Sequence, residues 1–102
     1  MYARVSIFKE PVDDAIRVTR EQVVPVVLGL PGSRGGFFLV NRDEAKTISL
    51  TLWESREALD ASAGPIERLR GDRTRDVPGS ELLELEEYEV VLAPPWAQGP
   101  SG

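Results

Sequence analysis

Residues 47–61, TISLTLWESREALDA, change from the spacing of a β-strand to that of a helix, and this change constrains the fold most. Three aliphatic side chains alternate with more polar residues: Ile48, Leu50 and Leu52 against Thr47, Ser49, Thr51 and Trp53. Such alternation is typical of a strand, whose successive side chains point to opposite faces of the sheet. Ser55 then offers an N-cap, and the spacing that follows it is helical. The segment therefore predicts a strand that leads directly into a helix.

The same kinds of pattern predict four strands and two helices in all. Strands are expected over residues 2–8 (YARVSIF), 36–42 (GFFLVNR), 46–53 and 82–92, and helices over 11–29 and from Ser55 to Leu69. Pro25 predicts a kink in the first helix or its early end, because proline removes a backbone donor and clashes with the preceding turn. The Gly64-Pro65 pair predicts a break in the second helix.

Three connections and one irregularity complete the local prediction. Loops are expected at 29–36 (GLPGSRGG) and 71–80, and a short hairpin turn at 41–45 (NRDEA). In the last strand, Leu85 and Tyr88 are expected on opposite faces. We interpret this change of phase as a β-bulge near Glu86 and Glu87.

The order of the elements is β-α-β-β-α-β, the ferredoxin-like arrangement of an α+β protein. It predicts one domain over residues 1–93, in which two helices cover one face of a four-stranded antiparallel sheet, and a proline-rich tail over 94–102 that includes Trp96. A solvated sheet face should alternate to polar residues. Here Tyr2, Phe8 and Trp53 oppose the aliphatic side of the sheet, so both faces carry bulky apolar groups. We therefore expect a second copy of the chain to cover the remaining face.

Charge and composition narrow the classes of function. The 102 residues carry a net charge of −5 at pH 7, which disfavours binding to nucleic acid phosphates. The chain has no cysteine and no histidine, so it lacks the residues of a zinc–thiolate site, the commonest metal ligand and the usual proton shuttle. No apolar run approaches the roughly 20 residues of a membrane span. These features predict a cytoplasmic protein without a metal site, nucleic acid partner or membrane association.

Residues 31–61, PGSRGGFFLVNRDEAKTISLTLWESREALDA, resemble the antibiotic-biosynthesis monooxygenase family of dimeric α/β barrels. The shared pattern is a Pro-Gly pair, a glycine-rich strand start, a hairpin, and a strand that ends in Trp-Glu-Ser before a helix. YARVSIF and EEYEVVLA are similar to the family's first and last strands, so the resemblance extends over residues 2–93. It implies a homodimer whose two sheets pack together. Members include cofactor-free oxygenases of quinols and anthrones, haem-degrading oxygenases and proteins with no known reaction.

The haem-degrading subgroup ligates iron through a histidine on the second helix. This chain contains no histidine, no cysteine and no methionine after Met1 to replace that ligand. Trp53 matches the position of a pocket tryptophan in the subgroup, but a tryptophan alone does not bind haem iron. The resemblance therefore implies a protein without a cofactor: a cofactor-independent monooxygenase acting on a small phenolic or quinol-like aromatic compound.

Such an oxygenase needs an apolar cavity, a group that accepts or steers a proton, and donors for a developing oxyanion. Five residues are candidates to line this pocket, each with a structural alternative: Trp53, Asn41, Tyr88, Tyr2 and Arg4. Trp53 is an N–H donor or a core residue, and the tyrosines are hydroxyl donors or strand aromatics. Asn41 holds a substrate oxygen or forms the hairpin turn, and Arg4 favours an anion or pairs with a carboxylate. No spacing among them requires catalysis, so the catalytic residues stay unassigned.

Two other motifs invite a functional interpretation. GLPGSRGG is not a dinucleotide-binding loop, because it follows a helix and opens a strand, the reverse of that fingerprint. RLRGDRTRD (68–76) is compatible with an anion site, but Asp72 and Asp76 lie between its arginines and favour a solvated, self-paired loop.

Three hypotheses of function follow. The first is the monooxygenase. The second is a non-catalytic dimeric α/β-barrel module that binds a small apolar ligand or nothing, and the third is a lactone isomerase or stress-responsive protein on the same fold. The absence of histidine weakens acid–base catalysis at neutral pH. A closed, apolar cavity beside Trp53 of roughly 300 Å³ or more, with a few convergent polar groups, would favour ligand chemistry, and a filled interior would favour the module.

Overall fold

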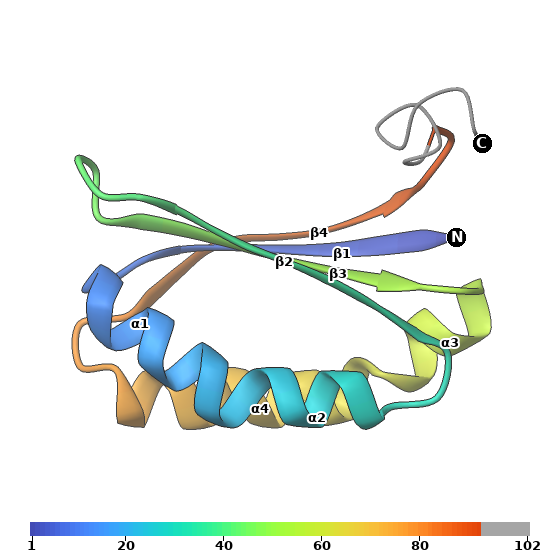
Figure 1. The fold of residues 1–102 in the computed structure, drawn as a ribbon, viewed down its shortest axis with the longest axis horizontal. Helices are drawn as coiled ribbons and strands as arrows, with labels where there is room; N and C mark the ends of the chain where they lie inside the picture. Colours follow the sequence, from blue (N-terminus) through green and yellow to red (C-terminus); the bar gives the residue numbers. More distant parts are fainter. Residues whose placement is uncertain (93–102) are drawn as a thin grey trace.

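The computed structural model describes residues 1–92, in which strands and helices follow one another in the predicted order (Figure 1). The strands are β1 (Tyr2–Lys9), β2 (Ser33–Asn41), β3 (Lys46–Trp53) and β4 (Glu81–Glu89). The helical segments are α1 (Val12–Val18), the π-helical η1 (Thr19–Val23), α2 (Val24–Gly29), α3 (Arg56–Ala61) and α4 (Ala63–Asp76). The predicted tail with Trp96 lies outside the described residues. Within residues 1–92, none of the helices is both long and apolar enough to cross a lipid bilayer.

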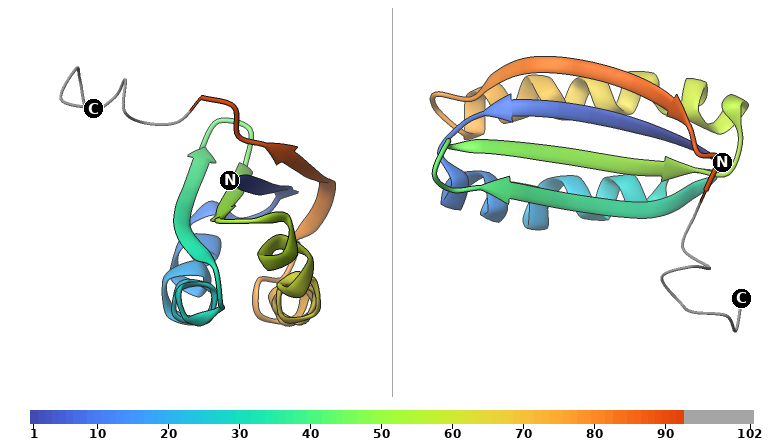
Figure 2. Two further views of the ribbon diagram at one scale, coloured as in Figure 1. Left: turned by 90° about the vertical axis from the view of Figure 1, so that its right-hand side faces the viewer. Right: turned by 90° about the horizontal axis from the view of Figure 1, so that it is seen from above.

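The four strands form one antiparallel sheet in the order β2-β3-β1-β4. The helices lie on one side of this sheet in two columns, α1–η1–α2 and α3–α4 (Figure 2). The other side of the sheet, which faces the viewer in the right-hand view of Figure 2, carries no helix. The predicted ferredoxin-like α+β fold, with its helices on one face, is therefore confirmed.

Pro25 does not end the first helix but follows a π-helical turn. The chain continues from α1 through η1 into α2, where Pro25 lies in the first turn. The N–H of Val24 donates to the carbonyl of Thr19, five residues earlier, so the turn before the proline is wider than an α-helical turn. Proline clashes with the carbonyl four residues before it, and a wider turn relieves that clash. The expected kink or early end thus takes the form of a local change in helix geometry.

The second helical segment breaks at Ser62, where α3 ends and α4 begins. The Gly-Pro pair falls in the first turn of α4, so the predicted break is confirmed. The loop predicted over 71–80 is wrong in its first half, because α4 continues to Asp76. Arg73 on this last part of α4 is buried, and Val77 just beyond it is fully buried. Local polarity indicated a loop, whereas the tertiary contacts of these two side chains fix a helix.

The predicted bulge in the last strand is wrong in position. Leu85 faces the helices and Tyr88 faces the opposite side, but the pairing of β4 with β1 is regular between them. Odd and even positions of a strand point to opposite faces, so simple alternation explains the change of face. The register instead shifts at Leu83, which has no partner on β1.

Trp53 lies on the helix-covered side of the sheet, at the centre of the core. Its side chain is fully buried and packs with Val27 of α2, Leu59 of α3 and Ile66 of α4. One tryptophan thus joins both helix columns to the sheet. This contact network explains why β3 ends its more polar side in a large aromatic residue just before a helix begins.

The side of the sheet without helices is apolar, and we call it the open face. The strand register places eight bulky apolar residues on it: Val5, Ile7, Phe37, Leu39, Ile48, Leu50, Leu52 and Tyr88. Glu84 and Glu86 of the edge strand β4 lie on the same face. In the single chain, 59% of the Phe37 surface is exposed. Both faces of the sheet are therefore apolar, as predicted, but the helices of the chain cover only the side of Trp53.

Candidate functional site

A cavity between the sheet and the helices consists of a groove and a small inner pocket. The groove has a volume of about 290 Å³ and the inner pocket about 30 Å³. The two share four lining residues and therefore lie side by side: Val23, Val27, Ser49 and Thr51. Small-molecule sites begin at roughly 300 Å³, and a pocket of the smaller size holds roughly two water molecules. The cavity therefore has room for the body of a small ligand in the groove and one of its polar groups in the inner pocket.

The groove lies between α2 and β2, and its walls are mainly apolar. Val24 and Leu28 of α2 are 43% and 61% exposed, so they mark the side on which the groove meets solvent. On the strand side the wall includes Gly36, where a Cβ atom would lie 2.1 Å from the carbonyl oxygen of Leu50. Only glycine permits this close approach of β2 to β3.

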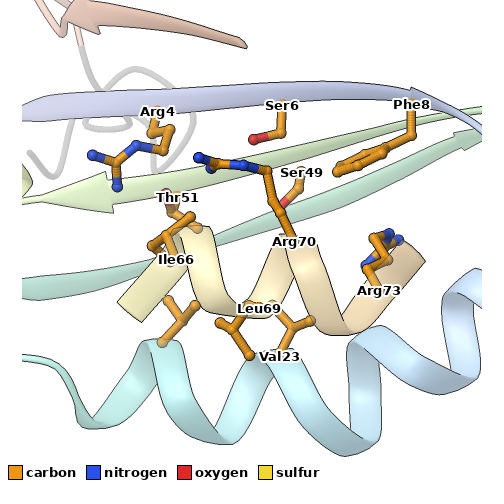
Figure 3. Close-up of a pocket in the computed structure, with 11 residues that line it drawn as sticks. Arg4, Ser6, Phe8, Val23, Ser49, Thr51, Ile66, Leu69, Arg70 and Arg73 are labelled. Atoms are coloured by element: carbon orange, nitrogen blue, oxygen red, sulfur yellow. The ribbon is translucent and has the colours of Figure 1, made fainter. Parts of the chain in front are cut away.

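The inner pocket is basic, although the whole chain is acidic. Its eleven lining residues include Arg4, Arg70 and Arg73 and no aspartate or glutamate (Figure 3). Three hydroxyl groups also line it: those of Ser6, Ser49 and Thr51. Arginine stays protonated in proteins, so the charge of this pocket persists at any ordinary pH.

Arg73 is fully engaged within the chain. Its Nε and Nη2 donate to the two carboxylate oxygens of Glu10 at 2.9 and 2.7 Å, and its Nη1 donates to Thr19 Oγ1 at 3.0 Å. The guanidinium carbon also lies 4.8 Å from the ring centre of Phe8 and 5.3 Å from that of Phe38. These distances are those of a bidentate ion pair with cation–π contacts, which fix Arg73 as a structural group.

The partner of Arg73, Glu10, is buried and accepts hydrogen bonds from three side chains. Besides Arg73, the hydroxyl groups of Thr47 and Ser80 donate to its carboxylate. Burial by itself raises the pKa of Glu10, but the hydrogen bonds and the charge of Arg73 outweigh burial and hold the pKa below its ordinary value. Glu10 is therefore an ionised anchor for β1 and α4, not a proton-transfer group for neutral pH.

Arg4 is also buried and ties β1 to the junction of α3 and α4. Its Nη1 donates to Ser62 Oγ at 2.6 Å, and its Nη2 donates to the carbonyl of Leu59 at 3.0 Å. Nη2 also lies 3.3 Å from Glu87 Oε2 on β4. Two of these three acceptors are neutral, and the Glu87 side chain is 37% exposed, so the positive charge of Arg4 is only partly balanced.

Arg70 has no such partners. Within residues 1–92, its Nη1 is the one buried side-chain nitrogen or oxygen without a hydrogen-bond partner. The side chain rises from α4 towards β1, and its guanidinium is directed to the side of Arg4 (Figure 3). Burial lowers the pKa of Arg70, and the nearby charge of Arg4 lowers it further. The structure thus leaves one buried, charged donor unsatisfied beside a second positive charge.

The five residues that were candidates to line a pocket do not lie together in the structure. Arg4 lines the inner pocket, whereas the other four line neither part of the cavity. Trp53 lies behind the wall, with its indole N–H donated to Thr51 Oγ1 at 3.0 Å. Tyr2 packs against the same core cluster, with the guanidinium carbon of Arg56 5.9 Å from its ring centre.

Asn41 and Tyr88 lie away from the cavity. Asn41 closes the hairpin between β2 and β3: its Oδ1 accepts from the N–H of Glu44 at 3.2 Å, and its Nδ2 donates to the Glu44 carboxylate at 3.0 Å. Tyr88 lies on the open face and is 50% exposed. The carboxylate of Glu86 beside it raises the pKa of Tyr88.

The arginines of α4 are candidates that sequence reasoning considered as an anion site but set aside in favour of a solvated loop. Arg70 and Arg73 were interpreted as parts of a solvated loop, but both reach into the cavity. A usable signal was present, because Ile66, Arg70, Arg73 and Val77 recur at intervals of three and four residues, the spacing of one helix face. Extending the helical period through charged residues would have placed both arginines on the buried side.

Sequence comparison finds relatives of the chain but no protein-family model that matches it. The uncharacterised protein Rv2557 of Mycobacterium tuberculosis is 31% identical over 94 residues, which cover 89% of this chain and 41% of the relative. A second protein of that species, MT2634, matches equally well. The chain thus spans about two fifths of the length of the curated relatives it matches.

Solved structures share the fold over nearly the whole chain. A Deinococcus radiodurans protein assigned as an antibiotic biosynthesis monooxygenase superposes with a TM-score of 0.70 at 9% identity, covering 91% of this chain and 95% of that one. SnoaB of Streptomyces nogalater, a cofactor-independent oxygenase solved as its N63A mutant, gives 0.69 at 15% identity over 92% and 96%. The haem-degrader MhuD of Mycobacterium tuberculosis gives 0.60 at 26% identity over 91% and 98%. The chain therefore shares its fold with a protein assigned as an antibiotic biosynthesis monooxygenase, a cofactor-independent oxygenase and a haem-degrader.

Proposed function

We propose that the chain is a cofactor-independent monooxygenase acting on a small phenolic or quinol-like aromatic compound. The observation that supports this most is the cavity, an apolar groove of about 290 Å³ that ends in a basic, hydroxyl-lined inner pocket. An aromatic ring fits apolar walls, and a phenolic oxygen fits hydroxyl donors next to positive charge. SnoaB, with the same fold, is described as a cofactor-independent oxygenase. Residence in the cytoplasm stays a prediction.

With a substrate that binds in its ionised form, this chemistry needs no proton acceptor from the protein, only hydrogen-bond donors and positive charge. A phenol that becomes a quinone gains one oxygen atom from O2, while the second oxygen leaves as water with two substrate hydrogens. The substrate supplies all the electrons, and its ionised form supplies them more readily. The basic inner pocket favours that ionised form, and Ser49 and Thr51 offer hydroxyl donors to its oxygen. The apolar groove excludes water from the ring.

Haem degradation, the activity named for MhuD, fits this chain less well. The resemblance implies a histidine ligand, and the chain contains no histidine. The groove of about 290 Å³ also lies at the lower limit for small ligands, and haem is a large one.

The proposal includes a homodimer that pairs two open faces. A sheet face that meets water alternates to polar residues, whereas this face is apolar across β1, β2 and β3. Pairing of two sheets would bury it.

The dimer is tested by a charge at the middle of the open face. We expect Ile48→Asp to split the dimer into monomers at micromolar concentration, as measured by light scattering. Val26→Asp, on the exposed side of α2, is the matched control and stays dimeric. A wild-type monomer would refute the pairing.

The alternative is a dimeric module that binds a small apolar ligand without catalysis. One observation favours it: neither part of the cavity is lined by an acid, a histidine, a cysteine or a tyrosine, so no lining group exchanges protons near neutral pH. The module and the enzyme would bind the same kind of ligand, and they differ only in oxygen consumption.

Oxygen uptake with a panel of quinols and phenols separates the enzyme from the module. We expect the wild type to consume oxygen faster than buffer for at least one compound. Val24→Trp places a large ring at the mouth of the groove and lowers uptake towards the buffer rate. Val26→Trp, two residues along α2 and outside the groove, keeps the wild-type rate. If no compound raises uptake above that in buffer, the monooxygenase proposal fails and the module is favoured.

A further inference from the structure

The three arginines of the inner pocket differ in how many hydrogen-bond acceptors and opposite charges the chain provides for them. Arg73 has a carboxylate, a hydroxyl group and two aromatic rings as partners, and Arg4 has a hydroxyl, a carbonyl and one half-exposed carboxylate. Arg70 keeps a buried Nη1 without a hydrogen bond in the described part of the chain. Buried polar atoms in native proteins almost always have partners, so such an exception calls for an explanation.

The charges around Arg70 do not supply that partner. Arg4 of β1 faces it with a like charge, and Glu67, one turn earlier on α4, raises the pKa of Arg70 less than burial and Arg4 lower it. Glu10 is committed to Arg73, and Glu87 to Arg4 and Arg56. A guanidinium cannot lose its proton to escape this environment, in contrast to a lysine. Residues 1–92 provide no acceptor for this N–H group, so the acceptor comes from outside the chain: water in the free protein, or an anion that also balances the charge.

We infer that Arg70, supported by the charge of Arg4, is an anion-binding subsite for the acidic oxygen of an aromatic ligand whose ring lies in the groove. The inner pocket of about 30 Å³ admits a carboxylate or a phenolate oxygen but no ring, and the ring has space in the adjoining groove, which shares four lining residues with it. Ser6 and Ser49 add hydroxyl donors at the same place. The inference deepens the proposed function by naming its ligand class, but it concerns binding and holds whether or not oxygen reacts.

Arg4 and Arg70 have different roles in this subsite. Both Nη atoms of Arg4 already donate to α3, Ser62 or β4, so Arg4 contributes charge and holds its position. Arg70 contributes the free N–H group that the ligand oxygen would accept from. Arg70 is therefore the residue to change, because its substitution breaks no contact that holds the fold.

The test is calorimetric titration of the full chain with two probes of equal shape, 2-naphthoate and the neutral 2-naphthamide. A charge-assisted hydrogen bond predicts that the wild type binds naphthoate roughly tenfold to hundredfold more tightly than naphthamide. Arg70→Met removes this preference while leaving naphthamide binding unchanged. Arg70→Lys keeps only part of it, because a lysine in this environment gives up its proton more readily than an arginine. Arg68→Met, at an exposed position of the same helix, is the matched control and keeps the wild-type preference.

A second probe distinguishes a phenolate ligand from a carboxylate ligand. 4-Nitrophenol ionises near neutral pH and only its phenolate is yellow, so a bound phenolate shifts the colour change to lower pH. Wild type and Arg68→Met are expected to produce this shift, and Arg70→Met is not. A colour shift without a naphthoate preference assigns the subsite to phenolates, and the reverse assigns it to carboxylates.

Three results would overturn the inference: equal affinity of the wild type for naphthoate and naphthamide with no colour shift, no binding of any probe, or an undiminished preference in folded Arg70→Met. Circular dichroism of each variant confirms folding. Failure of the monooxygenase proposal looks different, because the anion preference would persist while oxygen uptake stays at the buffer rate.

Discussion

Arg70 and Arg73 lie one helical turn apart on α4 and line the same inner pocket, yet only Arg73 has hydrogen-bond and charge partners in the described part of the chain. Arg73 has a side chain 4% exposed and pairs with a Glu10 side chain that is 0% exposed. Arg70 has a buried donor without a partner in residues 1–92. A buried arginine whose partners come from the chain holds the fold, whereas one that lacks a partner leaves a charge for a ligand. The two ends of one pocket thus serve structure and binding separately.

The largest effect is expected when the satisfied arginine is removed. Arg73→Met leaves Glu10 buried without its cation, and loss of one partner of a buried pair costs about 3–5 kcal/mol. Urea denaturation followed by circular dichroism measures this loss in the free energy of unfolding. Arg73→Lys keeps the charge but loses the two-pronged geometry and the aromatic contacts, so it falls between wild type and Arg73→Met. A loss below about 1 kcal/mol for Arg73→Met would contradict a structural role.

A smaller effect is expected when the same pair is weakened by acid. The pKa of Glu10 is lower in the folded chain than its ordinary value of 4.5, so below that pH the unfolded chain takes up the proton more readily. The stabilisation by ionised Glu10 is therefore complete above about pH 4.5 and is lost as the pH falls through the folded-state pKa. The difference in unfolding free energy between wild type and Glu10→Gln should shrink over that range. A pH-independent difference would count against the ion pair.

The smallest effect on stability is expected for the unsatisfied arginine. Arg70→Met replaces a half-buried, unpaired charge by an apolar side chain of similar length, so the free energy of unfolding stays the same or rises by about 1 kcal/mol. The exposed control Arg68→Met changes it by less than about 0.5 kcal/mol. Both are measured by the same urea titration. A loss above about 2 kcal/mol for Arg70→Met would mean that Arg70 has a partner in the chain, and the contrast with Arg73 would collapse.

The fold was predictable because its signals are local. Alternation along 46–53 gave β3 its observed bounds, and the hairpin turn at Asn41 followed from residue type. Pro25 shows the limit of local rules, because a π-helical turn precedes it and the helix continues as α2 instead of ending. The site was harder to predict. Trp53 was a candidate for either a pocket wall or the core, and it fills the core. The polar run after residue 70 was expected in solvent, but α4 continues through it to Asp76.

Residue order was enough to predict the succession of strands and helices and the apolar residues on both faces of the sheet, because side-chain periodicity records which residues share a face. That the helices cover the side of Trp53, and that Arg70 and Arg73 line a pocket, follows from how the elements pack in the folded chain. Periodicity does not indicate which element covers a given face of the sheet. It also does not identify the partner of a buried charge, because that partner comes from a remote part of the chain. Glu10 and Arg73 are 63 positions apart, and only folding brings the carboxylate to one arginine and leaves the other without it.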